Sequence, residues 1–245
     1  MVEEDRLQEL EQKELRKAQK RQLREEKRLR IKEKNEPPHL TILEEIGNAV
    51  SHGVGALLAA IGMVMLLIKS NTGLEIMGAL FYGISLFFLM LMSCLYHAFR
   101  SGSKVKRLWR RFDYSSIYLL IGGTFAPFYL VYMGNTLGIV LFCVQWGLIT
   151  LGITMVAVFG PGRLQWLHFP LYFTIGWSGL IFMPDWYRNS QPLFWLILIG
   201  GVIYTVGMIP FSRDKKHDHF IWHFFVLGGA ILHWIGIYLY VYLVV

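Results

Sequence analysis

Long, nearly uncharged apolar runs are the feature that most limits how this chain can fold. They cover residues 48–68, 74–97, 114–133, 136–158, 165–183, 192–210 and 220–244. A helix needs about 20 apolar residues to cross a hydrocarbon core of about 30 Å, and each run is close to that length. Inside lipid a helix satisfies its own backbone hydrogen bonds, whereas barrel strands are shorter and apolar on one face only. The runs therefore predict an all-α, polytopic membrane protein with seven transmembrane helices.

Lysine and arginine are distributed unequally between the two sides of these seven spans. One side would carry 22 of them and the other side only Lys69 and Arg188. Without the N-terminal segment the bias is still 10 against 2. Basic residues concentrate in cytoplasmic loops, so we expect a cytoplasmic N-terminus and a C-terminus outside, in a multi-pass protein of the cell membrane. The basic loops lack the interleaved aromatic residues of a single-strand binder, so no nucleic-acid partner is expected.

Residues 1–38 differ in composition from the rest of the chain. They are rich in Glu, Lys, Arg and Gln and end at Pro37 and Pro38. Their opening, MVEEDRLQEL, does not look like a cleavable signal peptide. The pattern predicts a charged, helical, cytoplasmic N-terminal tail followed by a transmembrane domain over residues 39–245. The two cysteines fall inside predicted spans, so no disulfide framework is expected.

Four polar residues from separate stretches reach the same membrane depth in this topology. His97 ends the second span, Asp113 begins the third, and His219 and His223 begin the seventh. The spacing of His219 and His223 places both on one face of a helix. Ser93 precedes His97 by the same spacing and would lie one turn deeper. Intramembrane ionisable groups are costly, so their convergence indicates a functional site at the cytoplasmic face.

The residue types at this site indicate a metal ion, with zinc the first choice. Three neutral imidazoles and a water form a common zinc site with one open position. His97, His219 and His223 are the predicted ligands, and Asp113 is suited to orient a ligand or to accept a proton from the bound water. The HFIWH sequence lacks the Glu of HExxH, so the mechanism of that protease class does not apply.

Simpler readings of the same histidines remain open. A single histidine at a membrane edge is usually interfacial or hydrogen-bonded to a neighbour. His168 is expected at the interface, and His233 is expected to be a buried hydrogen-bonding residue off the metal face. At the start of the first span, Glu44, Glu45, Asn48 and His52 would either brace the metal site or cap the helix.

Four segments of the chain together resemble the hemolysin III family, the bacterial branch of the progestin and adipoQ receptor superfamily. They are LEEIGNAVSHGVGA, SCLYHAF, RRFDYSSIYLLIGGTFAPF and HDHFIWHFFVLGGAILHWIGIY, and the resemblance extends over about residues 40–245. It implies that His97, His219 and His223 bind zinc, with Asp113 and Ser93 close to the metal and its water. Tyr114 stands where His is common in the family, and Ser51 stands where Thr is common. Neither departure removes a ligand.

Three functions are compatible with these features. The first is a zinc-dependent hydrolase that cleaves a lipid amide or ester, as the distant relation to alkaline ceramidases implies, with membrane lipid as substrate and Asp113 and Ser93 as catalytic residues. The second is a non-enzymatic, receptor-like or membrane-homeostasis protein with structural zinc. The third is a pore-forming cytolysin, which the absence of a repeated polar stripe argues against.

Overall fold

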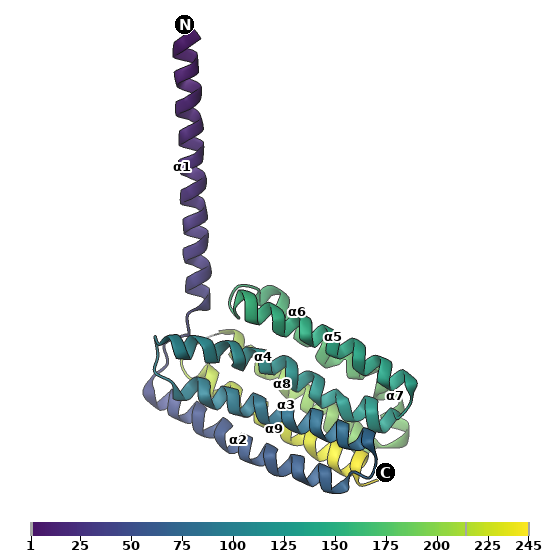
Figure 1. Ribbon diagram of the computed structural model, residues 1–245. Coiled ribbons are helices and arrows are strands. Elements are labelled where there is room, and N and C mark those ends of the chain that lie inside the picture. Colours follow the sequence, from purple (N-terminus) through teal and green to yellow (C-terminus); the bar gives the residue numbers. More distant parts are fainter. Residues whose placement is uncertain (1, 214, 245) are drawn as a thin grey trace. The chain divides into compact units, whose positions relative to one another are not determined.

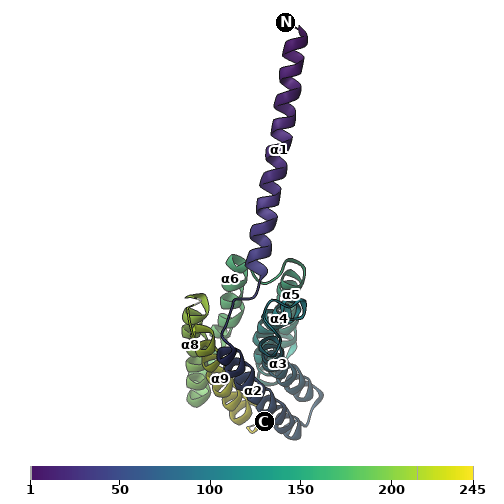
Figure 2. The ribbon, with the colours of Figure 1, turned by 90° about the vertical axis from the view of Figure 1, so that its left-hand side faces the viewer.

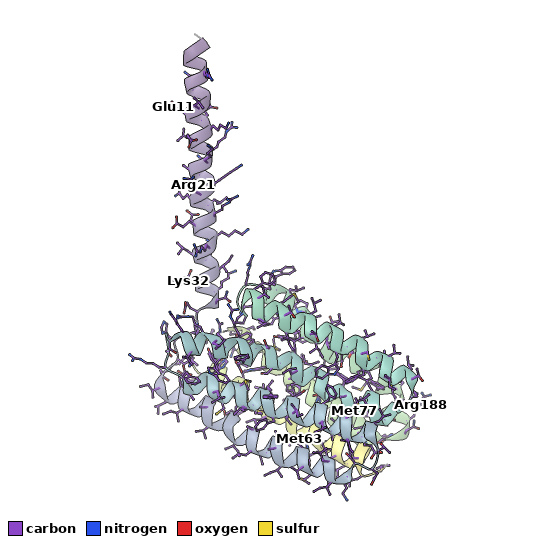
Figure 3. The ribbon with its side chains drawn as sticks, in the orientation of Figure 1. Glu11, Arg21, Lys32, Met63, Met77 and Arg188 are labelled. Atoms are coloured by element: carbon purple, nitrogen blue, oxygen red, sulfur yellow. The ribbon has the colours of Figure 1, made fainter. Side chains whose placement is uncertain are left out.

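The computed structural model describes residues 2–213 and 215–244, which form helices and no strand within those ranges. The chain divides into two compact units between Glu36 and Pro37. The first unit consists of the helix α1 (Val2–Asn35). Charged side chains extend from it along its length, including the labelled Glu11, Arg21 and Lys32 (Figure 3). Its mean composition is strongly polar, which explains why it forms no buried core of its own.

The second unit is a helical bundle built from the remaining elements (Figure 1). In chain order they are α2 (Ile42–Lys69), α3 (Gly73–Ala98), α4 (Lys104–Pro127), η1 (Phe128–Met133), α5 (Thr136–Phe159), α6 (Gln165–Gly176), η2 (Trp177–Phe182), α7 (Met183–Asn189), α8 (Gln191–Arg213), α9 (Asp218–Ile237) and η3 (Tyr238–Tyr242). The short segments η1 and η3 are π-helical, and η2 is a 3₁₀-helix.

Six helical stretches within the described ranges are long and apolar enough to cross a membrane. They are α2, α3, α4 together with η1, α5, α8, and α9 together with η3. Their outward surfaces are apolar, as the exposed side chains of Leu57, Leu58 and Ile61 on α2 illustrate. Lipid is the environment in which such surfaces carry no penalty. The protein is therefore an all-α, multi-pass membrane protein.

The run at residues 165–183 is not one continuous helix and is not among these six. It divides into α6, the 3₁₀-helix η2 and the start of α7. Pro184 occupies the first turn of α7, where its missing N–H is tolerated but would interrupt a helix passing through. Gly179 lies so close to α4 that an added Cβ would be 2.8 Å from the Phe125 ring. The local break thus accompanies close packing against α4.

Packing within the bundle brings distant segments together. Helix α2 packs against both α3 and α9, α3 packs against α4, and α8 packs against α9, as the side view shows (Figure 2). Small residues allow the closest contacts. A Cβ added to Gly122 would lie 2.1 Å from Ile149, and one added to Gly123 would lie 2.5 Å from Ser85. The Gly122-Gly123 pair therefore serves close packing.

Several helix ends meet at one end of the bundle, away from the C-terminus (Figure 1). Here α2, α4 and α9 begin and α3 ends, whereas the labelled Arg188 lies at the other end (Figure 3). Thr41 and Glu44 form a capping box that fixes the start of α2. Ser103 caps α4 through a 3.0 Å bond from the Lys106 backbone N–H. These caps define where the polar side chains of the first turns point.

Candidate metal centre

Three histidines converge where α3 ends and α9 begins. His97 comes from the last turn of α3, and His219 and His223 come from the first two turns of α9. One ring nitrogen from each lies within 4.8 Å of the other two. His97 and His223 are buried, and His219 is partly buried. The structure thus unites the three residues that the sequence analysis selected as ligands.

The nitrogens of this cluster are arranged for a shared cation. Nε2 of His97 lies 3.0 Å from Nε2 of His219. Two neutral imidazoles cannot both direct lone pairs at each other at this distance without a proton or a cation between them. Neutral imidazole nitrogens bind Zn, Cu, Fe and Ni. The donor set therefore fits a transition-metal ion.

Two side chains of α2 fix the orientation of the candidate ligands. Nδ1 of His97 lies 2.7 Å from a carboxylate oxygen of Glu45. Nδ1 of His223 lies 3.1 Å from Oγ of Ser51, whose hydroxyl donates to the Asn48 carbonyl at 3.0 Å. Each Nδ1–H therefore donates to an oxygen, and each Nε2 keeps its lone pair for a metal. Metal-binding histidines typically show this outer arrangement.

The first turns of α2 hold the other polar residues flagged in the sequence. Glu44 forms the helix cap with Thr41 and accepts a 2.8 Å hydrogen bond from the His217 backbone N–H, so it braces the helix ends and not the ligands. His52 is buried and stacks on His223 with ring centroids 3.7 Å apart. The amide nitrogen of Asn48 lies 3.5 Å from Nδ1 of His97. In this segment Glu44 therefore caps the helix, whereas Glu45 contacts a histidine of the cluster.

Asp113 and Ser93 lie beside the histidines and do not belong to the three-histidine group. The Asp113 carboxylate interacts with the Ser93 hydroxyl through a side-chain hydrogen bond, and Arg110 and Lys106 act on it electrostatically. Asp113, Ser93, His219 and His223 all line one cavity. The carboxylate therefore faces the same space as two of the candidate ligands.

This cavity has a volume of about 160 Å³ and extends into the bundle from the histidines. Its walls are mostly apolar and come largely from α3, α4, α6, η2, α8 and α9, with Leu120, Phe125, Trp222 and Val226 among the lining residues. Along α4 and into the start of η1 the lining continues from Asp113 to Phe128, a span of about 22 Å at the helical rise.

The two remaining membrane histidines have structural partners. His233 is buried, and its Nε2 lies 3.1 Å from the Ile197 carbonyl, which confirms its predicted hydrogen-bonding role. His168, which is predicted to lie at the membrane interface, is buried within the bundle. His168 is 1% exposed, and its Nδ1 lies 2.8 Å from the Tyr118 hydroxyl. Packing of α6 against α4 buries it, and the sequence pattern alone did not indicate that contact.

Sequence comparisons agree with the motifs that surround these residues. Residues 40–234 match the family described as "Haemolysin-III related". Hemolysin-3 of Bacillus cereus is 36% identical over 205 residues, which are 82% of this chain and 93% of that protein. The Hemolysin-3 homolog of Bacillus subtilis is 37% identical over 195 residues, or 78% and 91% of the two chains. The adiponectin receptor protein of Drosophila melanogaster is 27% identical over 224 residues, or 79% of this chain and 50% of that protein. The chain therefore belongs to the haemolysin-III related family, within the progestin and adipoQ receptor superfamily.

Proposed function

We propose that this protein is a zinc-dependent membrane hydrolase that cleaves an amide or ester bond of a lipid. The observation that carries the proposal is that Asp113 lines one mostly apolar cavity together with His219 and His223, two of the three clustered histidines. Most ligand cavities combine apolar walls with a few convergent polar groups, and this cavity has that character. The chemistry of the groups at its polar end suits hydrolysis of a carbonyl compound.

His97, His219 and His223 would hold the zinc ion through their Nε2 atoms. When bound, zinc would supply an activated water near neutral pH and polarise a carbonyl oxygen. Three histidines leave one coordination position open, which is the usual composition of a catalytic zinc site. Glu45 and Ser51 keep two of the rings in the tautomer that this requires, because each accepts an Nδ1–H.

The remaining groups would position the substrate and move a proton. Asp113 would accept a proton at its carboxylate and pass it to the leaving amine or alcohol. The Ser93 hydroxyl, which bonds to Asp113, would orient that carboxylate toward the cavity. The apolar walls would hold the acyl chain and exclude bulk water, so that the scissile carbonyl lies beside the histidines. A lipid diffusing within the bilayer is the substrate class that such walls favour.

The membrane topology forms part of the proposal. We propose seven crossings, with the N-terminus in the cytoplasm, the C-terminus outside and the metal centre near the cytoplasmic face of the cell membrane. The charge bias of 10 against 2 supports the orientation. The broken segment α6–η2–α7 would make the seventh crossing. Its 25 residues, 165–189, would extend about 38 Å at the helical rise, which exceeds the hydrocarbon core.

One observation favours a second function without catalysis. The histidines join α3 to α9, and the side chains that orient them come from α2. A metal ion there would connect three helices and stabilise the bundle, as a receptor-like or membrane-homeostasis protein would require. In that case the cavity would bind a lipid as a ligand and would not convert it.

A lipid-release experiment separates the two functions. The purified full-length protein, with its metal content measured by mass spectrometry, would be incubated with a total lipid extract, and released fatty acids would be quantified. We expect release by the wild type and none by a variant in which His97, His219 and His223 are all Ala. His168→Ala serves as the control, since His168 is a buried histidine that does not line the cavity. Stoichiometric zinc without any release from a broad lipid panel would favour the structural function.

A further inference from the structure

Lys106 would contact neither the metal nor the substrate in the proposed function, yet its side chain is fully buried next to Glu45, which contacts His97. Its ammonium group lies 2.7 Å from a carboxylate oxygen of Glu45, 3.0 Å from the Tyr96 carbonyl and 3.1 Å from the Phe99 carbonyl. An ammonium group has three protons, so these three acceptors satisfy it completely. A buried cation with a full set of partners indicates a defined role at this position.

Glu45 connects this lysine to a candidate ligand. One carboxylate oxygen lies 2.7 Å from Lys106 Nζ and also accepts a 3.3 Å bond from the Ser101 hydroxyl. The other oxygen lies 2.7 Å from Nδ1 of His97. Both oxygens are thus engaged, and the side chain is 13% exposed. The carboxylate reaches from α2 to α3 on one side and to α4 on the other.

We infer that Glu45 and Lys106 form a positioning pair that orients His97 for the metal and couples the loop of residues 99–103 to metal binding. Glu45 holds the proton on Nδ1 of His97, so that Nε2 keeps its lone pair and gains basicity. Lys106 fixes the carboxylate in place and prevents it from turning toward the metal as an additional ligand. Because Lys106 also bonds to the Tyr96 and Phe99 carbonyls, the same contacts hold the loop between α3 and α4. This inference rests on the proposed metal site.

The chain supplies a matched control for this pair. Glu44 precedes Glu45 in the sequence and is also poorly exposed. It contacts Thr41 and the His217 backbone, and no contact between Glu44 and the three histidines is found among the described residues. A change from Glu to Gln at either position has the same size and removes the same charge. Only the change at position 45 alters the group that faces His97.

The first test measures zinc affinity. Purified full-length protein in detergent would be titrated with zinc against a chromophoric chelator. We expect Glu45→Gln to weaken zinc binding by about 10- to 100-fold, the usual effect of losing a partner of a ligand. Glu44→Gln should lower thermal stability by the same amount with and without zinc, and its zinc affinity should remain close to that of the wild type. Equal zinc affinities for the two variants would overturn the inference.

A double-mutant cycle tests whether Lys106 acts through Glu45. Lys106→Met alone should weaken zinc binding, because it leaves the carboxylate without its anchor. In the Glu45→Gln background the same change should cause no further loss of affinity. The double variant also removes both buried charges together, which proteins tolerate better than loss of one partner, so it serves if a single variant fails to fold. If the loss of zinc-binding free energy in the double variant equalled the sum of the losses in the two single variants, Glu45 and Lys106 would not act as a pair.

Hydrogen exchange of the backbone tests the coupling to the loop. We expect amides of residues 99–103 to exchange more slowly when zinc is added to the wild type, and to show no zinc response in Glu45→Gln. If Glu45 had a purely structural role, Glu45→Gln would change the exchange rates of these amides by the same factor with and without zinc. If the wild type bound no zinc, both the metal site and this inference would fall. If the wild type bound zinc and Glu45→Gln bound it with the same affinity, only this inference would be excluded.

Discussion

At the scale of single residues, the capacity of the histidine cluster to bind a metal depends on which nitrogen of each ring carries a proton. For His97 and His223 the Nδ1 proton is held by oxygens of Glu45 and Ser51, and this leaves Nε2 directed at the shared position. The spacing of His219 and His223 in the sequence identifies them as neighbours on one helix face. It does not identify Ser51, whose contact with His223 joins residues 172 positions apart. The cue in the sequence was only a serine preceding His52.

Replacing His223 with Ala should remove one of the three ligands. We expect zinc content and melting temperature to fall together, because a metal that binds only the folded state stabilises it through its affinity. Metal content measured by mass spectrometry and thermal unfolding followed in detergent would check this. His168→Ala is the control, since it deletes an equally buried histidine outside the cluster. Full zinc occupancy in the His223 variant would exclude this histidine as a ligand.

Asp113→Asn distinguishes a catalytic from a structural centre. The change keeps the shape of the side chain and removes its charge and its capacity to accept a proton. Zinc should largely remain, since three histidines are intact, whereas lipid hydrolysis should decrease by about 10²- to 10⁴-fold, the usual contribution of a positioned base. Asp185→Asn, which alters a carboxylate outside the cavity lining, should leave the rate unchanged. Hydrolysis at the wild-type rate in the Asp113 variant would exclude the proposed base.

At the scale of helices, small residues decide which elements approach closely. On α4, Gly123 contacts α3 so tightly that an added Cβ would lie 2.5 Å from the Ser85 side chain and 2.8 Å from the Phe81 carbonyl oxygen. On α5, Gly147 has no atom within 4 Å of the position that a Cβ would occupy. The sequence shows both residues as glycines within apolar helices, and only the packing separates their roles.

These two glycines should respond oppositely to substitution by Ala. Gly123→Ala should destabilise the bundle by about 1–3 kcal/mol, because a rigid backbone oxygen would have to move. Gly147→Ala should be neutral or stabilise the helix by up to about 1 kcal/mol, because Ala loses less backbone entropy. Thermal unfolding of the two purified variants in the same detergent would measure the difference. Equal melting temperatures would mean that α3 and α4 are not packed as described.

At the scale of the whole molecule, the orientation of the bundle decides which compartment the metal centre faces. The starts of α2, α4 and α9 and the end of α3 share one end of the bundle, and Arg188 lies at the other (Figure 3). The basic residues between positions 98 and 113, in the α3–α4 loop and the first turns of α4, therefore belong to the same end as the histidines. If this end is cytoplasmic, as the charge bias predicts, the C-terminus lies outside.

Reporter fusions after residue 245 would test this orientation. We expect activity of a reporter that functions outside the cytoplasm, and no activity of one that requires the cytoplasm. A second fusion in the 98–103 loop should give the opposite result, because that loop lies at the end of the histidines. A cytoplasmic signal from both fusions would contradict an odd number of crossings and would remove α6–η2–α7 as the seventh.

Local features of the sequence were sufficient to predict the helical membrane class, the family and the three histidines of the cluster. The length of the apolar runs, the uneven distribution of Lys and Arg, and the i,i+4 spacing of two histidines are local features. Such features can be identified in a single sequence. Helix packing was needed to show where the run at residues 165–183 is broken, that His168 is buried, and that Glu45 and Ser51 contact clustered histidines while Lys106 contacts Glu45. Those features depend on contacts between residues tens to more than a hundred positions apart. These contacts form and contribute stability only when the helices pack together. The hydrophobic pattern along the chain does not show which side chains of different helices will be in contact.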